Sequence, residues 1–428
     1  MGGSGPRDRG RRTAALLTCA AVAAGSAAGC SGGGAQDEEL GVAVAPGGGA
    51  VLRPDGQIAV RSQGGTIENV TVAGGGSAVE GVLSADRSQW RSRWTLDPGR
   101  SYTVHATAVG KDGRSRTVSS RFATAQVKAT SAMGLDAPSD RETVGIGMPI
   151  VLKFDKKVTD RAAVERALEV RSDRPVEGAW HWFEGDEGPE AVFRPRQYWP
   201  AHTRVSFRAH LSGVRTGRDV YGVKNYGVDF RVGDEHVSTV GEDNHKMVVK
   251  FNGRKVRTIP TSMGRGGARK YTTTNGVHLA MAKKDPTVMT SEWEGCGPGC
   301  AGYYSLTVYK AVQISGSGEY VHSAPWSVGS QGHDNVSHGC INISPSNAAW
   351  FYRHAYRGDP VTVTGTSREL EPDNGWGYWQ LDWSKWVKGS ALGRSVTTAP
   401  RADTATLSAQ PGDAPPANPG AEPGAKGN

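Results

Sequence analysis

Helical periodicity is scarce in this chain of 428 residues, and its cysteines number only five. The scarcity of amphipathic helical patterns excludes an all-helical fold. The apolar run at residues 13–24 is too short to cross a bilayer as a helix. No basic patch interleaved with aromatic residues is present, which argues against nucleic-acid binding. The 59 glycines and 23 prolines instead indicate two to four loop-rich domains, and the formal net charge of +8 suits attraction to an anionic cell wall or membrane surface.

The N-terminus has the pattern of an export signal. Four arginines among the first twelve residues precede the apolar run, and small residues then lead to Cys30. We therefore expect a signal peptide over residues 1–29, lipidation of Cys30, and a tether over residues 30–44 that holds the protein at the outer face of the membrane. Cleavage without lipidation is the alternative, because Ala27 stands three residues before Cys30, where leucine is usual.

The other cysteines divide into a pair and a single residue. Cys19 leaves with the signal peptide, so Cys296, Cys300 and Cys340 remain in the mature chain beside the lipidated residue. In an oxidising compartment Cys296 and Cys300 can pair, because the glycine-rich turn between them brings the two within bonding reach. Two free thiols are the alternative. The pairing would leave Cys340 as an unpaired thiol.

Short alternating apolar runs separated by turn residues predict a mainly β chain. We expect one immunoglobulin-like β-sandwich over residues 45–126 and a second over residues 127–237. Lys111-Asp112-Gly113 predicts a hairpin turn in the first, and a short helix is expected near residues 161–168 in the second. The large aromatic residues of the second domain are interpreted as core: Trp180, Trp182, Tyr198 and Trp199.

A third, β-rich domain is expected over residues 238–366. Asn252-Gly253 predicts that it opens with a type I′ hairpin, since both positions of that turn need a positive φ. Ser344 predicts the N-cap of a helix that ends near Arg357, with Gly358 as its left-handed C-terminal residue.

Two segments follow the third domain. Residues 367–392 hold four of the twelve tryptophans, and so many aromatic residues in a short segment predict a packed C-terminal subdomain. Residues 393–428 are dominated by proline, alanine, glycine and polar residues, which predicts a disordered tail.

The stretch from Tyr320 to Asn347 carries the chemistry. A thiol needs a nearby imidazole or positive dipole to become a nucleophile, and His322 and His338 are the candidate partners of Cys340. An inert, buried cysteine is the plain alternative. A zinc site is the other, built from His322, His333, His338 and Cys340, although the spacing lacks the compact two-ligand knuckle that zinc sites favour.

The runs His322–Trp326 and Ser337–Asn347 closely resemble the catalytic motif of L,D-transpeptidases of the YkuD type, especially the multidomain enzymes of mycobacteria and other actinobacteria. The resemblance implies that residues 238–366 are the catalytic domain of an enzyme that cross-links peptidoglycan, with no cofactor and no metal. It implies 3-3 cross-links between a donor tetrapeptide stem and an acceptor stem, formed through a thioester on cysteine. It also implies that carbapenems acylate the same thiol.

The resemblance assigns roles residue by residue. Cys340 is the implied nucleophile, and His322, held by Ser323, is the implied base. A preformed thiolate–imidazolium pair is the charged alternative. His338 is implied to shape the loop and contact substrate. The implied oxyanion donors are the backbone N–H groups of Gly339 and Cys340 and the Tyr304 hydroxyl.

The remaining implied residues line the pocket or cover it. The pocket residues are Met289, Trp326 and Asn342. Residues 292–305 resemble the active-site lid of the family, but Cys296 and Cys300 lie where no cysteine is expected. A hydrolase that uses the same residues, such as an L,D-carboxypeptidase or an endopeptidase-like enzyme, and a non-catalytic wall-binding lipoprotein are the alternative functions.

Overall fold

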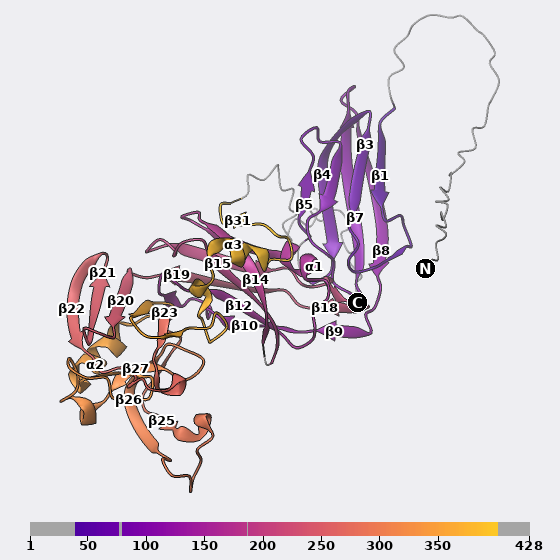
Figure 1. The fold of residues 1–428 in the computed structure, drawn as a ribbon. Helices are drawn as coiled ribbons and strands as arrows, with labels where there is room; N and C mark the ends of the chain where they lie inside the picture. The colour runs from indigo at the N-terminus through magenta and orange to yellow at the C-terminus, as the bar shows by residue number, and fades with distance from the viewer. Residues whose placement is uncertain (1–38, 77–78, 186, 401–428) are drawn as a thin grey trace, which may run out of the picture. The chain divides into compact units, whose positions relative to one another are not determined.

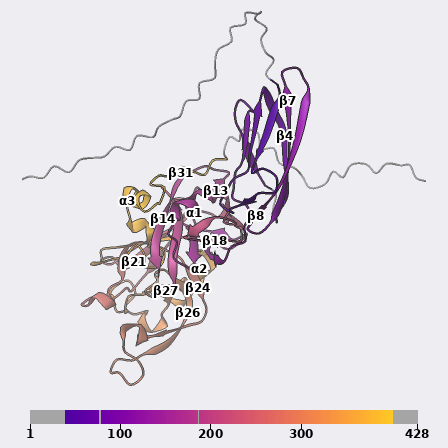
Figure 2. The same ribbon diagram turned by 90° about the vertical axis from the view of Figure 1, so that its right-hand side faces the viewer.

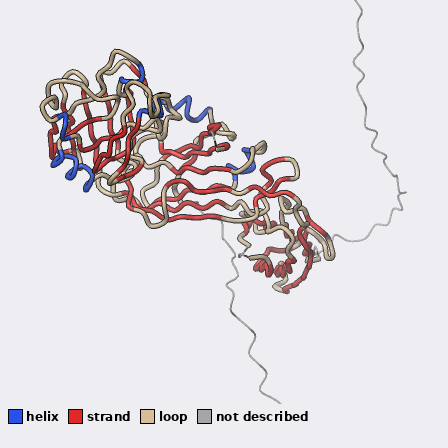
Figure 3. Tube along the Cα trace, turned by 90° about the horizontal axis from the view of Figure 1, so that it is seen from below, coloured by secondary structure: helices blue, strands red, loops and turns tan. Residues whose placement is uncertain are grey.

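The computed structural model describes residues 39–400, apart from 77–78 and 186 (Figure 1). The predicted signal peptide, Cys30 and the first part of the tether therefore lie outside the described residues, as do residues 401–428. Strands greatly outnumber helices, as Figure 3 shows, which confirms the mainly β prediction. Among the described residues, no helix is both long and apolar enough to cross a membrane.

Two four-stranded sheets form the first β-sandwich, in the orders β1-β3-β6-β5 and β2-β8-β7-β4. Trp90, which is fully buried, lies in the core between them. The predicted hairpin is confirmed, because β7 and β8 pair from Ser101↔Ala123 to Val109↔Ser115. The strands are β1 (Gly41–Ala45), β2 (Val51–Leu52), β3 (Ala59–Gln63), β4 (Gly65–Gly74), β5 (Gly81–Leu83), β6 (Gln89–Ser92), β7 (Ser101–Gly110) and β8 (Ser115–Thr124).

The N-terminal edge of this sandwich differs from the prediction. Residues 41–44, which we expected in the tether, belong to β1 and pair with β3. Val42 and Val44 pack against the core of the sandwich. Their alternation with smaller residues is a strand pattern that the glycine-rich composition of the preceding segment concealed.

The second sandwich has a five-stranded sheet, β10-β12-β15-β14-β31, facing a four-stranded sheet, β11-β19-β16-β13, with a small sheet β17-β18-β9 beside them. Trp180, Trp182 and Trp199 are buried, which confirms their interpretation as core. Helix α1 (Arg161–Arg166) ends two residues before the predicted end, because Leu168 starts β13. The strands are β9 (Ala129–Ser131), β10 (Met133–Ala137), β11 (Thr143–Val144), β12 (Ile150–Phe154), β13 (Leu168–Ser172), β14 (Glu177–Gly185), β15 (Gly188–Pro195), β16 (Arg204–Ala209), β17 (Arg215–Gly217), β18 (Val220–Gly222) and β19 (Tyr226–Val232).

The third region has a six-stranded sheet, β22-β21-β20-β29-β23-β30, and a second sheet, β24-β26-β27-β28, in which β25 also pairs with β26. Asn252 and Gly253 have φ of 49° and 76°, so the predicted hairpin turn is confirmed. The strands are β20 (His236–Gly241), β21 (Lys246–Phe251), β22 (Arg254–Pro260), β23 (Thr274–Leu279), β24 (Ala282–Lys284), β25 (Thr287–Thr290), β26 (Ser305–Gln313), β27 (Tyr320–Ser323), β28 (Ile341–Ile343), β29 (Pro360–Thr364) and β30 (Arg368–Glu369). The short 3₁₀ helices are η1 (Arg269–Tyr271), η2 (Ser291–Glu294), η3 (Pro325–Ser327) and η4 (Tyr378–Gln380).

The main helix of this region, α2 (Pro345–His354), starts as predicted but ends early. The Ser344 side chain accepts a hydrogen bond from Asn347 N, which confirms the N-cap. The helix stops three residues before Arg357, because Ala355 already adopts an extended backbone. Gly358 does have a φ of 90°, but it lies in the turn before β29, where an added Cβ would come within 2.8 Å of Met148.

The C-terminal segment packs on the second sandwich. Helix α3 (Trp383–Lys388) lies beside β14 in Figures 1 and 2, and its Trp386 is fully buried. The Trp386 indole donates to the carbonyl of Ala179 at 2.9 Å, and the Arg194 guanidinium lies 4.6 Å from the centre of its ring. Packing of the Trp-rich segment is thereby confirmed.

Part of the predicted disordered tail is a strand. β31 (Val396–Thr397) pairs with β14, with Glu177 opposite Thr397. Thr398 is fully buried and its hydroxyl bonds that of Ser172 at 2.6 Å. The prediction of disorder was therefore wrong for residues 393–400, since an exposed edge of the sandwich supplied a partner that composition alone does not reveal.

Candidate active site

Two parallel strands bring the predicted nucleophile and base together. β27 ends with His322 and Ser323, and β28 begins directly after Cys340, with His322 opposite Asn342. Val321 and Ile341 on these strands are fully buried, which fixes the register. Cys340 and His322 line one cavity of about 420 Å³, together with other predicted residues: Met289, Tyr304, Trp326, His338 and Asn342.

His322 is arranged as a neutral base. The residue is 3% exposed, and its Nδ1 lies 2.9 Å from the carbonyl oxygen of Ser323. Since a carbonyl can only accept, Nδ1 carries the proton and the lone pair lies on Nε2. Burial lowers the pKa of His322 and outweighs the opposing bonds to Ser323 and Asn342. The imidazole is therefore uncharged at neutral pH and able to take a proton.

Cys340 is held as a thiol rather than a thiolate. Burial raises its pKa to about 12, against a hydrogen bond from the Tyr320 backbone, and the negative charge of Glu319 adds to the rise. A protonated thiol beside a neutral imidazole favours base-assisted attack. It disfavours the preformed thiolate–imidazolium pair.

The backbone around the nucleophile differs from the implied oxyanion site. Gly339 N–H donates to the Ser337 hydroxyl at 3.0 Å, and that hydroxyl donates to the Cys340 carbonyl at 2.6 Å. The Gly339 N–H is therefore already occupied, contrary to the role implied for it. The Cys340 N–H and the Tyr304 hydroxyl are the other donors that the resemblance implies, and their roles stay predictions.

His338 belongs to an aromatic stack at the rim of the cavity. Its ring stacks on that of Tyr304, with the centroids 5.1 Å apart and an angle of 9° between the ring planes. The Tyr271 ring also lies 5.1 Å from it, at an angle of 46°. Arg265 Nη1 lies 2.9 Å from His338 Nε2. Because a guanidinium can only donate, Nε2 is the acceptor and His338 is neutral in this arrangement.

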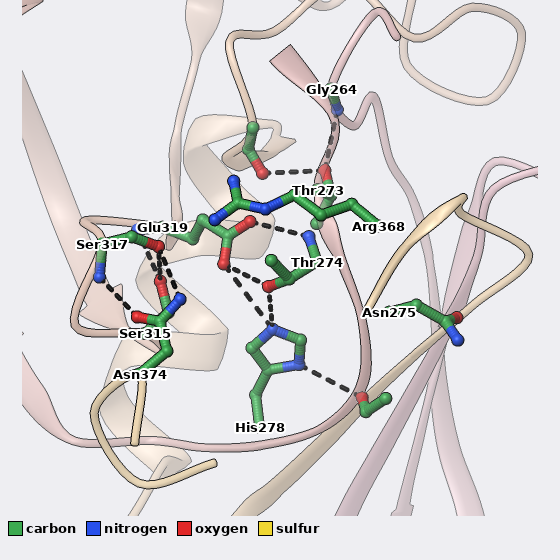
Figure 4. A network of polar contacts seen from close by, with 12 residues as sticks. Gly264, Thr273, Thr274, Asn275, His278, Ser315, Ser317, Glu319, Arg368 and Asn374 are labelled. Atoms are coloured by element: carbon green, nitrogen blue, oxygen red, sulfur yellow. Dashed lines mark hydrogen bonds and ion pairs between the residues drawn. The ribbon is translucent and has the colours of Figure 1, made fainter. Parts of the chain in front are cut away.

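A buried polar chain next to Cys340 has no counterpart in the sequence analysis (Figure 4). The Glu319 carboxylate accepts from Thr274 N at 2.7 Å and from the Thr274 hydroxyl at 2.5 Å. That hydroxyl lies 2.7 Å from His278 Nε2, and His278 Nδ1 lies 3.1 Å from the Gly276 carbonyl. The Thr274 hydroxyl, which donates to Glu319, therefore links a buried carboxylate to a buried imidazole.

This chain supports the nucleophile loop. Thr273, next to Thr274, donates its hydroxyl to the Gly339 carbonyl at 2.7 Å and accepts from Gly264 N at 2.9 Å. Burial opposes ionisation of Glu319, but the bonds from His278 and Thr274 prevail and lower its pKa. A fixed negative charge therefore lies beside Cys340. No local motif could have identified Glu319, since its partners come from β23.

The segment predicted to be the lid is the loop of the β25–β26 hairpin. Thr290 pairs with Ser305 at its base, and the structure joins Cys296 to Cys300 by a disulfide with the Cα atoms 5.3 Å apart. Cys340 is the free cysteine of the described chain. Across residues 39–400, as far as they are described, no group of three or more His, Cys, Asp or Glu side chains could hold a metal ion.

Comparison with known proteins is consistent with this geometry. Residues 235–363 match the L,D-transpeptidase catalytic domain, YkuD, and residues 50–215 match the bacterial Ig domain. L,D-transpeptidase 2 of Mycobacterium tuberculosis is 36% identical over 341 residues, which cover 79% of this chain and 81% of that protein. L,D-transpeptidase 5 of the same species is 37% identical over 320 residues, which cover 74% and 69%.

Solved structures of L,D-transpeptidases were also found among the similar proteins. The structure of the L,D-transpeptidase LdtMt1 in complex with imipenem is 36% identical and covers 55% of this chain and 99% of its own, with a TM-score of 0.47. An L,D-transpeptidase from Mycobacterium smegmatis is 35% identical and covers 55% and 100%, with a TM-score of 0.44. Because L,D-transpeptidases 2 and 5 are more than 30% identical to this chain and more than two thirds of each is covered, the chain belongs to the L,D-transpeptidase family.

Proposed function

We propose that this peptidoglycan L,D-transpeptidase forms 3-3 cross-links through a thioester on Cys340, with His322 as the general base. One observation carries the proposal: a protonated thiol and a neutral imidazole line the same cavity. A cysteine that served only as a buried apolar residue would not need a neutral imidazole in the same cavity.

The first half-reaction acylates the enzyme. Cys340 Sγ attacks the carbonyl of the donor's third residue while its proton passes to His322 Nε2. The carbonyl oxygen becomes an oxyanion that the Cys340 N–H and the Tyr304 hydroxyl stabilise. The C–N bond then breaks, and the proton on His322 passes to the departing amine of the fourth residue. The products are a thioester and a neutral amine.

The second half-reaction returns the enzyme to its starting state. The acceptor's side-chain amine attacks the thioester carbonyl and gives a proton to His322. The C–S bond breaks, and the proton passes from His322 to the sulfur of Cys340. Because water could replace the acceptor amine, hydrolysis competes with transfer unless the cavity excludes it.

The other predicted residues have places consistent with substrate binding. Asn342 is buried and bonds Ser327 at 3.2 Å, beside the base. Trp326 is 53% exposed at the cavity, where it can cover a bound peptide, and Met289 lines both cavities that reach Cys340. Ser323 contributes its backbone carbonyl to the orientation of His322.

Two expectations about the surroundings of the enzyme belong to the same proposal. The enzyme acts on cell-wall peptidoglycan outside the cytoplasm, and we propose that lipid on Cys30 holds it at the membrane. We also propose that carbapenems acylate Cys340, since a relative was solved in complex with imipenem and a strained lactam carbonyl presents the same electrophile to the thiol.

The test uses disaccharide-tetrapeptide as substrate and mass spectrometry of the products. Wild-type enzyme should give a cross-linked dimer, and Cys340→Ala should give none while it remains folded. A Cys296→Ser/Cys300→Ser double variant, which retains Cys340, is the matched control and should still form dimer. Monomeric tripeptide without dimer would identify a hydrolase instead, and unchanged substrate with wild-type enzyme would indicate a non-catalytic binding protein.

A further inference from the structure

One sheet of the second sandwich carries a group of arginines around a cavity of about 520 Å³. Four neighbouring segments of the sheet each contribute one of them: Arg141, Arg171, Arg204 and Arg231. Arg171 lies on β13, Arg204 on β16 and Arg231 on β19, and Arg141 lies just before β11. The two described cavities that reach Cys340 include none of these residues. We call the four residues the arginine cluster.

The alternation of the strands directs the two central arginines away from the core. Val205 and Phe230 are buried in the core, so Arg204 and Arg231, which precede and follow them along the strands, face outwards and are exposed. The register of β16 and β19 places Arg204 directly opposite Arg231. Like charges in this position destabilise a sheet, because the Cβ atoms of directly opposite residues are only about 5 Å apart.

The carboxylates around the cluster do not balance its charge. Within the described part of the chain, neither Arg204 nor Arg231 forms a side-chain ion pair. Asp173 and Asp229 also line the cavity. Arg208, which lies outside the cavity, donates two hydrogen bonds to the Asp229 carboxylate, at 3.0 and 2.9 Å. Asp173 accepts a hydrogen bond from the backbone N–H of Arg204 at 2.9 Å, so the cavity keeps a net positive charge.

The two outer arginines extend this positive charge across the sheet. Arg171 donates to Glu169 at 2.9 Å, but its buried Nε has no hydrogen-bond partner among the described residues. Arg141 forms an exposed ion pair with Asp140 at 3.5 Å. The sheet order β11-β19-β16-β13 and a strand spacing of about 4.8 Å separate the outer members by roughly 14 Å. That span is wider than one anionic group, so the cluster complements a chain of them.

The arrangement of the charges favours phosphodiester groups. Guanidinium groups bind oxyanions through paired N–H donors. Arg204 and Arg231 approach an anion from two strands, and a tetrahedral phosphodiester has two free oxygens that point in different directions. A flat anionic lipid surface fits less well, because the arginines line a cavity that Asp173 and Asp229 also line. A chain with spaced charges can enter the cavity and avoid these carboxylates.

We propose that the arginine cluster is a second binding site, which holds a phosphodiester polymer of the cell envelope against the second sandwich. An anion between Arg204 and Arg231 removes their mutual repulsion, and Arg141 and Arg171 bind the neighbouring groups of the polymer. This inference rests on the location outside the cytoplasm proposed above and is independent of the chemistry of Cys340. The site gives the enzyme a contact with the wall that does not involve the stem peptide.

The experiment measures, by fluorescence anisotropy, how the full chain binds a labelled synthetic poly(glycerol phosphate). Wild-type protein should bind it, with an affinity that falls as the salt concentration rises. Arg204→Gln/Arg231→Gln should weaken binding about tenfold or more, because charge-assisted hydrogen bonds are lost. The same variant should be at least as stable as wild type in urea unfolding, because it removes a like-charged pair of directly opposite residues.

Arg61→Gln/Arg91→Gln is the matched control. It removes two exposed arginines from β3 and β6 of the first sandwich, outside the cavity. Its affinity for the polymer should stay within about twofold of wild type, because salt screens distant charges. Both double variants should cross-link soluble disaccharide-tetrapeptide at the wild-type rate, so failure of the transpeptidase function and failure of this inference are seen in separate assays.

Several outcomes would overturn the proposal. Equal binding by wild type and Arg204→Gln/Arg231→Gln would show that the cluster does not hold the polymer. An equal loss in the control variant would show attraction by net charge alone. Tighter binding of polyglutamate than of poly(glycerol phosphate) would assign the site to carboxylates. Binding to phosphatidylglycerol vesicles that needs Arg204 and Arg231, without binding of the polymer, would assign it to the membrane.

Discussion

The state of the Cys340 thiol predicts how the enzyme responds to pH. With a pKa of about 12, roughly one thiol in 100,000 is ionised at pH 7. An unperturbed thiol, with a pKa of about 8.5, is ionised in about one molecule in 30. At pH 7 the thiolate fraction of Cys340 is therefore about 3,000-fold smaller than that of an unperturbed thiol. A more basic thiolate is intrinsically more nucleophilic, so each Cys340 thiolate should react roughly 40-fold faster, which offsets part of that difference. We therefore expect Cys340 to react with a small alkylating reagent about 100-fold more slowly than an unperturbed thiol.

Iodoacetamide and intact-protein mass spectrometry measure this directly. The alkylation rate should rise about tenfold per pH unit from pH 7 to 10 without a plateau, because the pKa lies above that range. Glutathione in the same reaction serves as the unperturbed thiol. Peptide mapping should place the single adduct on Cys340, since Cys296 and Cys300 are bridged.

A different profile would refute the reasoning. A rate that levels off with an apparent pKa below 8 would identify a preformed thiolate–imidazolium pair. His322→Ala separates the two cases further. Removal of an imidazolium partner would raise the apparent pKa of a preformed thiolate and lower its neutral-pH rate, whereas the profile of a protonated thiol should keep its slope.

Local signals account for the parts of the fold that were predicted correctly. Asn252-Gly253 specifies a turn through its own backbone preferences, and Ser344 caps a helix through a bond three residues away. Such features need no information from distant parts of the chain. The cysteine and histidines of the candidate site could be proposed for the same reason, since they fall in one short stretch of sequence.

The errors occurred where distant contacts decide the structure. The end of α2 could not be placed from sequence, because Gly358 fits its turn through close approach to Met148, more than 200 residues earlier. β31 forms only because β14 presents an edge to it. Glu319 and Arg368 escaped notice because their neighbours at the nucleophile come from separate strands. Glu319 belongs to the candidate site because it is buried beside Cys340, and its burial depends on how the whole domain folds.

Four further variants test the supports of the site and of the C-terminal segment. Glu319→Gln should cost about 1.5–3 kcal/mol at pH 7, because it replaces the charged acceptor of the buried Thr274 N–H and hydroxyl by a neutral one. Folding lowers the pKa of Glu319, so this loss should be full above about pH 4.3 and should shrink as the pH falls further, as measured by urea unfolding at each pH. Cys296→Ser/Cys300→Ser should raise the KM for the donor by roughly two- to tenfold and leave kcat little changed. The reason is that the glycine-rich lid becomes less ordered before substrate binds. An unchanged KM would show that the disulfide does not order the lid. Trp386→Ala should cost about 3–5 kcal/mol, because it empties a fully buried indole site on the second sandwich. Trp386→Phe retains most of the buried ring and loses mainly the indole hydrogen bond, so its cost should be nearer 1 kcal/mol. Near-equal destabilisation by the two variants would mean that the hydrogen bond, rather than the packing of the ring, attaches the C-terminal segment to the core.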